Sequence, residues 1–280
     1  MENIIINIDT SYRDIVSYPN AGLFTYKLNN SLKNITYIRL SSIELPIVYY
    51  TFTEKYGNIS FRIFFGNQKH DIIIQEGNYD SVMIITEIQS KLDLLNQTYG
   101  TTFNLSWDMI NYKITLTNKT AFTLFFDNGI SQNHRTLGNR LGFRYDNQGY
   151  MSNNQKTKLD LNTNTTIYYW TGETIMDIAK DNYLFLRIND YGVIYNDNRS
   201  PGIIAKLLLY DTQYIIETGA NFITKSYNFK QPVTLNKFDI ELINKRGETI
   251  DMSLIDYSLT LELGQIYDKN QYINYDFKVK

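Results

Sequence analysis

The residue types that most often carry acid–base, metal or thiol chemistry are scarce in this chain. It contains two histidines, His70 and His134, and no cysteine, so disulfides, zinc–thiolate sites and cysteine catalysis are excluded. A catalytic or metal-binding histidine needs a carboxylate partner that folding brings close. His70 stands beside Asp71 at the expected start of a strand, and His134 lies in a polar stretch. We therefore interpret both as solvated histidines with a structural role.

One acidic segment has part of the pattern of a calcium-binding loop. Residues 160–164 read Asp-Leu-Asn-Thr-Asn, which resembles the opening of such a loop. The loop requires glycine at its sixth position and glutamate at its twelfth, where this chain has Thr165 and Thr171. The segment is therefore interpreted as a polar loop, and no metal ligands are assigned.

Other short motifs associated with enzymes are missing from the sequence. There is no nucleophile elbow, phosphate-binding loop, dinucleotide fingerprint or zinc-protease motif, and no carboxylate pair stands out as a glycosidase couple. Gly138 and Gly142 have the spacing of small residues in packed membrane helices. Arginines flank them, so the glycines are expected to permit tight turns. The sequence predicts a protein that is not an enzyme, with no catalytic and no cofactor-binding residues.

Aromatic residues are unusually frequent. The chain has 24 tyrosines and 15 phenylalanines. Tyrosine favours strands and interfaces because it buries a large area and keeps a hydroxyl group for hydrogen bonding. Tyr168, Tyr169 and Trp170 form a cluster that could serve as an interface or stack on sugar rings. The alternative, which we prefer, is that this cluster belongs to the core of a strand.

Alternation of apolar and polar residues predicts that most of the chain is β-structure, with turns rich in Asn and Gly between the strands. A break at Asn29–Ser31 is expected to divide the first long run into two strands, and residues 103–126 are expected to form a β-meander. The clearest alternating sets are Phe24/Tyr26/Leu28, Ile59/Phe61/Ile63, Leu184/Leu186/Ile188, Phe238/Ile240/Leu242 and Leu259/Leu261/Leu263.

One segment has the periodicity of an amphipathic helix. Asp80 or Ser81 can cap its start, and Gly100 lies just beyond its expected end. A short second helix is expected over Thr174–Lys180. The apolar residues that fall on one face of the first helix are Val82, Ile85, Ile88, Leu92 and Leu95.

The polar, Asn-rich stretch 146–164 is the best candidate for a linker. We expect residues 1–57 and 165–280 to form one β-sandwich and residues 58–145 to form an inserted α+β module, because an insertion is tolerated where a loop leaves and returns at neighbouring points. This organisation is preferred to two sequential domains.

Charge and hydropathy exclude several classes of protein. The net charge is −2 and no basic stripe is visible, so no nucleic-acid partner is expected. The first residues lack the basic and apolar regions of a signal peptide. No segment approaches the roughly 18 apolar residues of a membrane-spanning helix.

Three parts of the chain, its two ends and its middle, carry motifs in a fixed order. These segments are Asp9–Asp14, Tyr18–Asn20, Leu40–Pro46, Glu76–Tyr79, Leu141–Phe143, Phe238–Leu242, Gly247 and Ser258–Glu262. Together they resemble structural proteins of nucleocytoplasmic large DNA viruses. The middle also resembles the minor capsid, or penton, proteins of virus-like transposons and smaller relatives.

The resemblance implies a mainly β fold, a jelly-roll-like antiparallel β-sandwich with an inserted α+β module carrying one amphipathic helix. It implies a virion structural protein, a penton or other minor capsid component, which assembles in the host cytoplasm into an icosahedral shell. The implied partners are other copies of the chain, as in a pentamer, the major capsid protein, or both. Contact with an internal viral membrane is compatible with this role, as are cement and internal scaffold positions.

Two other functions are weighed against this one. A β-sandwich attachment protein that binds host-surface glycans would use Trp107 or Trp170, together with the cluster of Tyr168, Tyr169 and Trp170. An enzyme without a recognisable motif would require a cleft in which several titratable groups converge.

Overall fold

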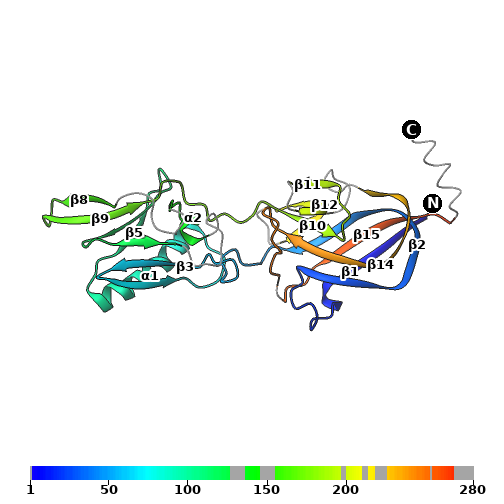
Figure 1. Cartoon of the computed structure of the whole chain (residues 1–280), viewed down its shortest axis with the longest axis horizontal. Helices are drawn as coiled ribbons and strands as arrows, with labels where there is room; N and C mark the ends of the chain where they lie inside the picture. The colour runs from blue at the N-terminus through cyan, green and yellow to red at the C-terminus, as the bar shows by residue number, and fades with distance from the viewer. Residues whose placement is uncertain are drawn as a thin grey trace. The chain divides into compact units, whose positions relative to one another are not determined.

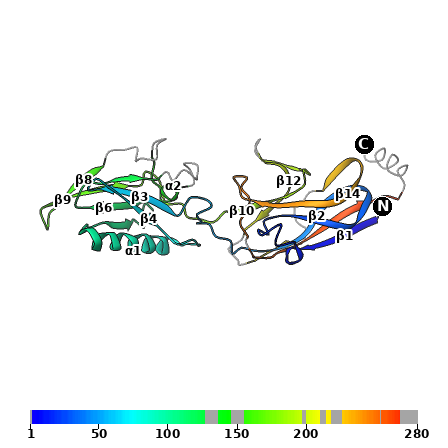
Figure 2. The ribbon, with the colours of Figure 1, turned by 60° about the horizontal axis from the view of Figure 1, so that its bottom comes forward.

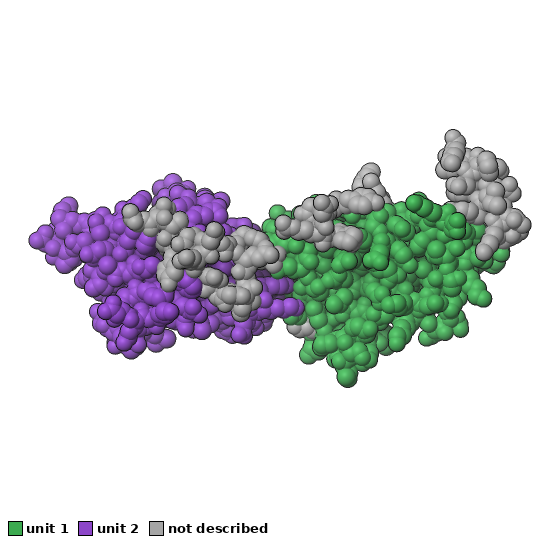
Figure 3. Space-filling view, viewed as in Figure 1, with its two compact units in different colours: residues 1–49, 181–280 green, residues 50–180 purple. Residues whose placement is uncertain are grey.

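A computed structural model describes residues 2–126, 136–145, 155–196, 200–209, 214–217, 226–252 and 254–267. The chain divides into two compact units, residues 1–49 with 181–280 and residues 50–180 (Figure 3). Within the described residues, no helix is both long and apolar enough to span a bilayer.

The unit formed by the two ends of the chain is built on one antiparallel sheet (Figure 1). The strands follow the order β1-β15-β2-β14-β10-β12-β11, and β13 pairs with β2. The strands are β1 (Glu2–Asp9), β2 (Leu23–Pro46), β10 (Tyr183–Ile188), β11 (Ile194–Asn196), β12 (Ser200–Leu208), β13 (Tyr214–Glu217), β14 (Tyr227–Ile243) and β15 (Ser258–Gln265), and a 3-10 helix, η1 (Thr10–Tyr12), follows β1.

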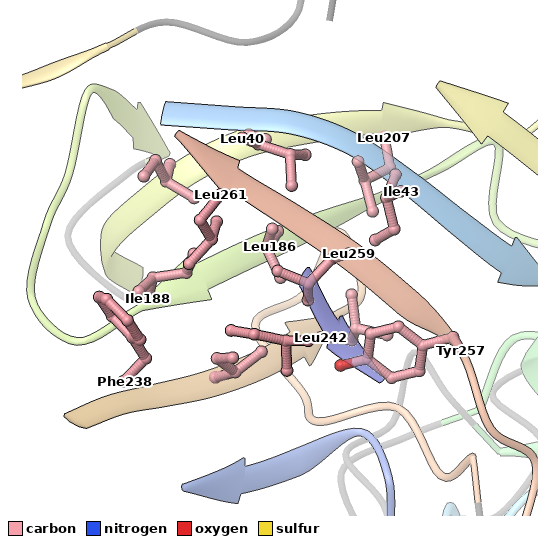
Figure 4. Close-up of a cluster of buried hydrophobic side chains, with 14 of the residues drawn as sticks. Leu40, Ile43, Leu186, Ile188, Leu207, Phe238, Leu242, Tyr257, Leu259 and Leu261 are labelled. Carbon is pink, nitrogen blue, oxygen red and sulfur yellow. The ribbon is translucent and has the colours of Figure 1, made fainter. Parts of the chain in front are cut away.

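The long strand β2 belongs to both layers of a sandwich. Its first half pairs with β14, where Tyr26 faces Phe238, and its second half pairs with β15, where Leu40 faces Leu261. Side chains from both groups of strands converge on one core (Figure 4). Alternation places Leu259, Leu261 and Leu263 inside this core, as expected for a half-buried strand. The two ends of the chain therefore share one hydrophobic interior.

The described residues of the unit 50–180 form two antiparallel sheets and two helices. One sheet has the order β4-β3-β7 and the other β5-β6-β9-β8. Helix α1 packs against β4 and β5 and lies along one face of the strands (Figure 2). The elements are β3 (Ser60–Phe65), β4 (Gln68–Ile73), α1 (Ser81–Tyr99), β5 (Asn104–Trp107), β6 (Ile114–Asn118), β7 (Thr123–Phe125), α2 (Leu137–Arg140), β8 (Lys156–Asp160) and β9 (Thr165–Thr171).

The amphipathic helix has the bounds that its capping residues predict. The Asp80 side chain accepts hydrogen bonds from the first turn, and Gly100 ends the helix in the left-handed conformation at φ 66°. Its buried face differs from the expected one by part of a turn. Ile84, Ile88 and Leu92 are buried, whereas Val82 is 61% exposed.

Several expected elements are corrected by the structure. β2 is continuous through Asn29–Ser31, with Asn34 in the left-handed region at φ 58°. Residues 103–126 do not form a meander, because β7 leaves β6 and pairs with β3. The helix expected over Thr174–Lys180 is absent, and the only described helix nearby is α2.

The backbone of residues 174–180 is not helical because its hydrogen bonds go to distant segments. The N–H groups of Thr174, Met176 and Asp177 donate to the carbonyl groups of Gly142, Tyr112 and Arg140, respectively. These tertiary bonds replace the local bonds that a helix would need.

The expected domain boundaries also differ from those of the structure. The units divide at 49/50 and 180/181, whereas we placed the boundaries after residues 57 and 164. Part of the expected linker lies outside the described residues, but residues 156–160 form β8, which pairs with β9. The fold class is confirmed: a mainly β, jelly-roll-like antiparallel sandwich with an inserted α+β unit that carries one amphipathic helix.

Candidate functional site

The loop after β1 is held to the other end of the chain by a buried arginine. The Arg13 side chain is 1% exposed, and its guanidinium pairs with the carboxylate of Asp256. It also donates hydrogen bonds to the carbonyl oxygens of Thr10 at 2.9 Å, Tyr18 at 3.0 Å and Pro19 at 3.3 Å. A planar guanidinium suits this set because its donors are fixed in direction.

Two further polar side chains strengthen the same junction. The Thr10 hydroxyl donates to Asp256 at 3.0 Å and accepts from the backbone N–H of Tyr257 at 2.9 Å. The Asn20 amide donates to the carbonyl of Ile250 and accepts from the N–H of Met252. The polar residues of the N-terminal motif are therefore used to connect segments that are more than 200 residues apart.

The outer face of β1, β15 and the second half of β2 carries a ladder of polar contacts. The Glu262 carboxylate accepts from the Tyr37 hydroxyl at 2.7 Å and from Arg39 at 2.6 and 3.0 Å. Burial alone would raise the pKa of Glu262, but the hydrogen bonds from Tyr37 and Arg39 and the charge of Arg39 outweigh it and lower that pKa. The Tyr37 hydroxyl oxygen also lies 3.1 Å from the side-chain amide of Asn3 on β1.

A surface depression of about 360 Å³ lies at one end of this ladder. Asp9, Ser258 and Glu44 are cross-strand neighbours on three adjacent strands, so their side chains share one face. The depression is lined by Asp9, Ser11, Glu44, Pro46, Asp256, Tyr257 and Ser258.

The charge of the depression favours a cationic group. Three carboxylates line it and one of them, Asp256, is paired with Arg13. The Asp9 carboxylate accepts from the backbone N–H and hydroxyl of Ser11, at 2.9 and 2.6 Å. In the described part of the chain, no group of three or more histidine or acidic residues is placed to hold a metal ion. The arrangement can therefore bind a lysine or arginine side chain through charge-assisted hydrogen bonds.

The three aromatic candidates on β9 are divided between the two faces of the strand. Trp170 is 6% exposed, and its indole N–H donates to the carbonyl of Phe122 at 3.1 Å. Tyr168 packs partly buried against the same core. Trp170 is thus part of the strand core, and its ring is not open to a sugar. Tyr169 is half-buried near the ammonium group of Lys158, and its role in an interface stays a prediction.

The prediction that both histidines are exposed to solvent is wrong for His70. His70 is buried, not solvated, and its ring stacks on Phe65 with centroids 4.2 Å apart and meets Tyr99 edge-on at 4.6 Å. Its Nε2 atom has no hydrogen-bond partner among the described residues. The neighbouring Asp71 pairs with Arg62. His134 lies outside the described residues.

The acidic loop forms the turn between β8 and β9. The Asp160 carboxylate accepts from the Thr163 hydroxyl at 2.7 Å and from the Asn162 N–H at 3.0 Å. These hydrogen bonds, that of Thr163 foremost, lower the pKa of Asp160. Asn164 adopts the left-handed conformation at φ 52°, which asparagine tolerates in turns.

The two glycines of the α2 region are required by close packing. A Cβ atom on Gly138 would lie 2.2 Å from the ring of Phe126. Gly142 has φ +86°, and a Cβ atom there would lie 2.3 Å from the carbonyl oxygen of Thr174.

Sequence reasoning identified Arg13 and Glu44 only as parts of motifs and did not select Asp256. No local pattern marks these residues, since each has its partner on another strand or at the opposite end of the chain. The signal that was available is the unusual density of polar residues immediately after an apolar strand, at Asp9–Asp14.

Among the comparisons with known proteins, matches were found only to solved structures. The chain matches no family model. It also matches no curated protein. Among solved structures, it is similar to the mavirus penton protein, with a TM-score of 0.43 and 12% identity over 95% of this chain and 100% of that one. It is also similar to a chain in the 3.5 Å cryo-EM structure of the Sputnik virophage, with a TM-score of 0.39 and 12% identity over 98% and 99%.

Proposed function

We propose that this protein is a non-enzymatic structural component of a virion, a penton or other minor capsid protein. It would assemble with copies of itself, with the major capsid protein, or with both, in an icosahedral shell built in the host cytoplasm. The proposal rests on one observation: the N-terminal and C-terminal motifs lie on the adjacent strands β1 and β15, and the Arg13–Asp256 ion pair links them.

Polar side chains of the sandwich join segments of the chain to one another, and this supports a role in assembly. Arg13, Thr10 and Asn20 join distant segments, and Glu262 joins β15 to β2. The depression bounded by Asp9, Glu44 and Asp256 contains no described histidine or lysine that could act with a carboxylate in acid–base chemistry. What the surface offers is a polar sheet face and a strand edge, which are features that another protein can cover.

The division of the chain into two units is also compatible with a closed ring of copies. A ring around a vertex needs heterologous contacts, in which different patches of neighbouring copies meet. A sandwich with its strand edges on one unit and a separate α+β unit supplies different patches for the ring and for the surrounding shell. The division of these roles between the units is part of the proposal.

The test is to find and locate the chain in particles. Mass spectrometry of purified virions should detect the chain at a constant ratio to the major capsid protein, and a density map should show it at the vertices or between capsomers. Its absence from washed particles, or hydrolytic activity lost on substitution of Asp9 or Glu44, would exclude the proposed role.

A further inference from the structure

The outer side of β1 is an uncovered strand edge in the described part of the chain. β1 pairs with β15 through eight consecutive residues without a register shift, and no described strand pairs with its other side. The backbone N–H of Thr10 donates to the carbonyl of Tyr257. Strand alternation therefore directs the backbone groups of every second residue away from β15. These residues are Asn3, Ile5, Asn7 and Asp9.

β1 also lacks the features that usually shield an edge strand. Lysines, prolines and bulges protect most natural edges from pairing with other chains. The edge strand β8 exposes Lys156 and Lys158, whereas β1 has neither lysine nor proline. β1 has 8 residues, whereas the other described edge strands β4, β5, β7, β8, β11 and β13 have 6, 4, 3, 5, 3 and 4. Such an edge is suited to receive an added strand.

The charges of β1 argue against pairing with β1 of a second copy. The strand begins with Glu2, ends with Asp9 and contains no basic residue. Full antiparallel pairing of two copies would set Glu2 against Asp9 twice, and parallel pairing would set each acid against itself. Like charges directly opposite each other in a sheet are destabilising. The added strand should instead bring positive charge to the Asp9 end, where Glu44 and Asp256 also lie.

The C-terminal sequence of the chain has this composition. Residues 272–280 are nine in number, close to the eight of β1. Its apolar residues alternate with polar ones, and its last polar positions are lysines. The apolar set is Ile273, Tyr275, Phe277 and Val279, and the polar set is Asn274, Asp276, Lys278 and Lys280.

We propose that residues 272–280 of a second copy add to the edge of β1 as a parallel strand. The apolar set would extend the inner face of the sheet beside Ile4, Ile6 and Ile8, and the lysines would reach the carboxylates at the depression. The proposal rests on the proposed function for the assumption that copies of the chain assemble. Repeated from copy to copy, the contact is heterologous and can close a ring.

Disulfide trapping tests the contact directly, because the chain has no native cysteine. A tagged full-length chain carrying Ile5→Cys is mixed under mild oxidation with a full-length chain carrying Asn274→Cys, Asp276→Cys or Lys278→Cys. Mixed dimers should form at least about tenfold faster than with the control Leu159→Cys in place of Ile5→Cys. The control is matched because Ile5 and Leu159 are 58% and 54% exposed.

Two outcomes of this trapping would overturn the proposal. One is the absence of any preference for Ile5→Cys over Leu159→Cys. The other concerns a chain that carries Ile5→Cys together with one of the C-terminal cysteines. If this chain forms an internal disulfide in preference to a disulfide between two copies, residues 272–280 cover the β1 edge of their own chain.

Substitutions that spare the fold give a second readout. Ile5→Pro removes an outward N–H and leaves the ladder to β15 intact, so self-association measured by sedimentation should weaken at least about tenfold. Glu44→Lys should also weaken self-association, and adding Lys280→Glu to the Glu44→Lys chain should restore part of the lost association. Asp190→Lys is the matched control, because it reverses an exposed charge of the same unit away from β1. Unchanged association of a folded Ile5→Pro chain would overturn the proposal.

Failure of this inference differs from failure of the proposed function. If the chain is present in particles but Ile5→Cys gives no mixed dimers, the capsid role stands and the strand contact is wrong. If mixed dimers form but washed particles lack the chain, the strand contact stands and the capsid role is wrong.

Discussion

The guanidinium of Arg13 is paired with the carboxylate of Asp256, which lies 243 residues further along the chain. The two partners differ in environment: the Arg13 side chain is 1% exposed and that of Asp256 is 41% exposed. A buried charge is stable only when its donors are satisfied, so Arg13 depends on its partners more than Asp256 does. The pair closes the sandwich where β1 ends and β15 begins.

Replacement of the buried arginine should destabilise the sandwich. Arg13→Met removes hydrogen bonds to three carbonyl groups as well as the ion pair, and bonds from a charged donor contribute roughly 1.5–3 kcal/mol each. We expect the free energy of unfolding to fall by about 3 kcal/mol or more, measured by urea titration with far-UV circular dichroism. The control Lys237→Met breaks the exposed Lys237–Asp239 pair and should cost less than about 1 kcal/mol. Equal losses in the two variants would contradict the structural role of Arg13.

Acid should weaken the contact between β15 and β2 through Glu262. The folded-state pKa of Glu262 lies below the ordinary value of 4.5, so the folded state favours the ionised form. Its contribution is complete above the unfolded pKa and is lost as the pH falls through the lower, folded pKa. Glu262→Gln should therefore destabilise the protein at pH 7, and the difference from the wild type should shrink as the pH falls below about 4.5.

The measurement is the free energy of unfolding at half-unit steps from pH 7 to pH 3. Glu2→Gln is the control, because it removes an exposed carboxylate from β1 that has no ion pair among the described residues; its curve should run parallel to that of the wild type. A Glu262→Gln difference that grows as the pH falls would show that the sign is wrong.

The turn at Gly142 should not accept a side chain. Its φ of +86° and the Thr174 oxygen 2.3 Å from an added Cβ atom both oppose alanine. A non-glycine residue in such a conformation costs about 1–3 kcal/mol before any clash is counted. Gly142→Ala should therefore lose about 2 kcal/mol or more, measured by tryptophan fluorescence, since Trp107 and Trp170 both lie in the unit of residues 50–180.

Gly77→Ala is the matched control for this substitution. No atom lies within 4 Å of an added Cβ at Gly77, and its φ is outside the left-handed region. Its effect should stay within about 0.5 kcal/mol. A comparable loss at both positions would indicate a general effect of removing glycine.

Local rules predicted the elements whose signals are local. Asp80 and Gly100 fixed both ends of α1, because caps act within one turn. The alternation of Leu259, Leu261 and Leu263 fixed the inner face of β15 in the same way. These features depend on residues at most a few positions apart.

Features that depend on tertiary partners could not be predicted in this way. The apolar residues of α1 allow two overlapping faces, and only the positions of β4 and β5 select Ile84 over Val82. His70 is polar in sequence but buried, because its ring stacks on Phe65 and meets Tyr99 edge-on. Residues 174–180 could form a helix, but their N–H groups bond elsewhere. The Arg13–Asp256 pair joins residues 243 positions apart, and the local pattern around Arg13 does not identify Asp256 as its partner.

Trp170 should matter for stability, and Tyr169 should not. Trp170→Phe removes the hydrogen bond to Phe122 and leaves a void in the core, so we expect a loss of about 1–3 kcal/mol. Tyr169 is half-buried on the other face of β9, and Tyr169→Ala should cost less than about 1 kcal/mol. Urea titrations followed by far-UV circular dichroism measure both, since this signal does not depend on the tryptophan that is replaced. A glycan array probed with the wild type and both variants tests the attachment-protein alternative. If Trp170→Phe abolished glycan binding while the unfolding curve was unchanged, Trp170 would be a sugar-stacking residue and its assignment to the core would be wrong.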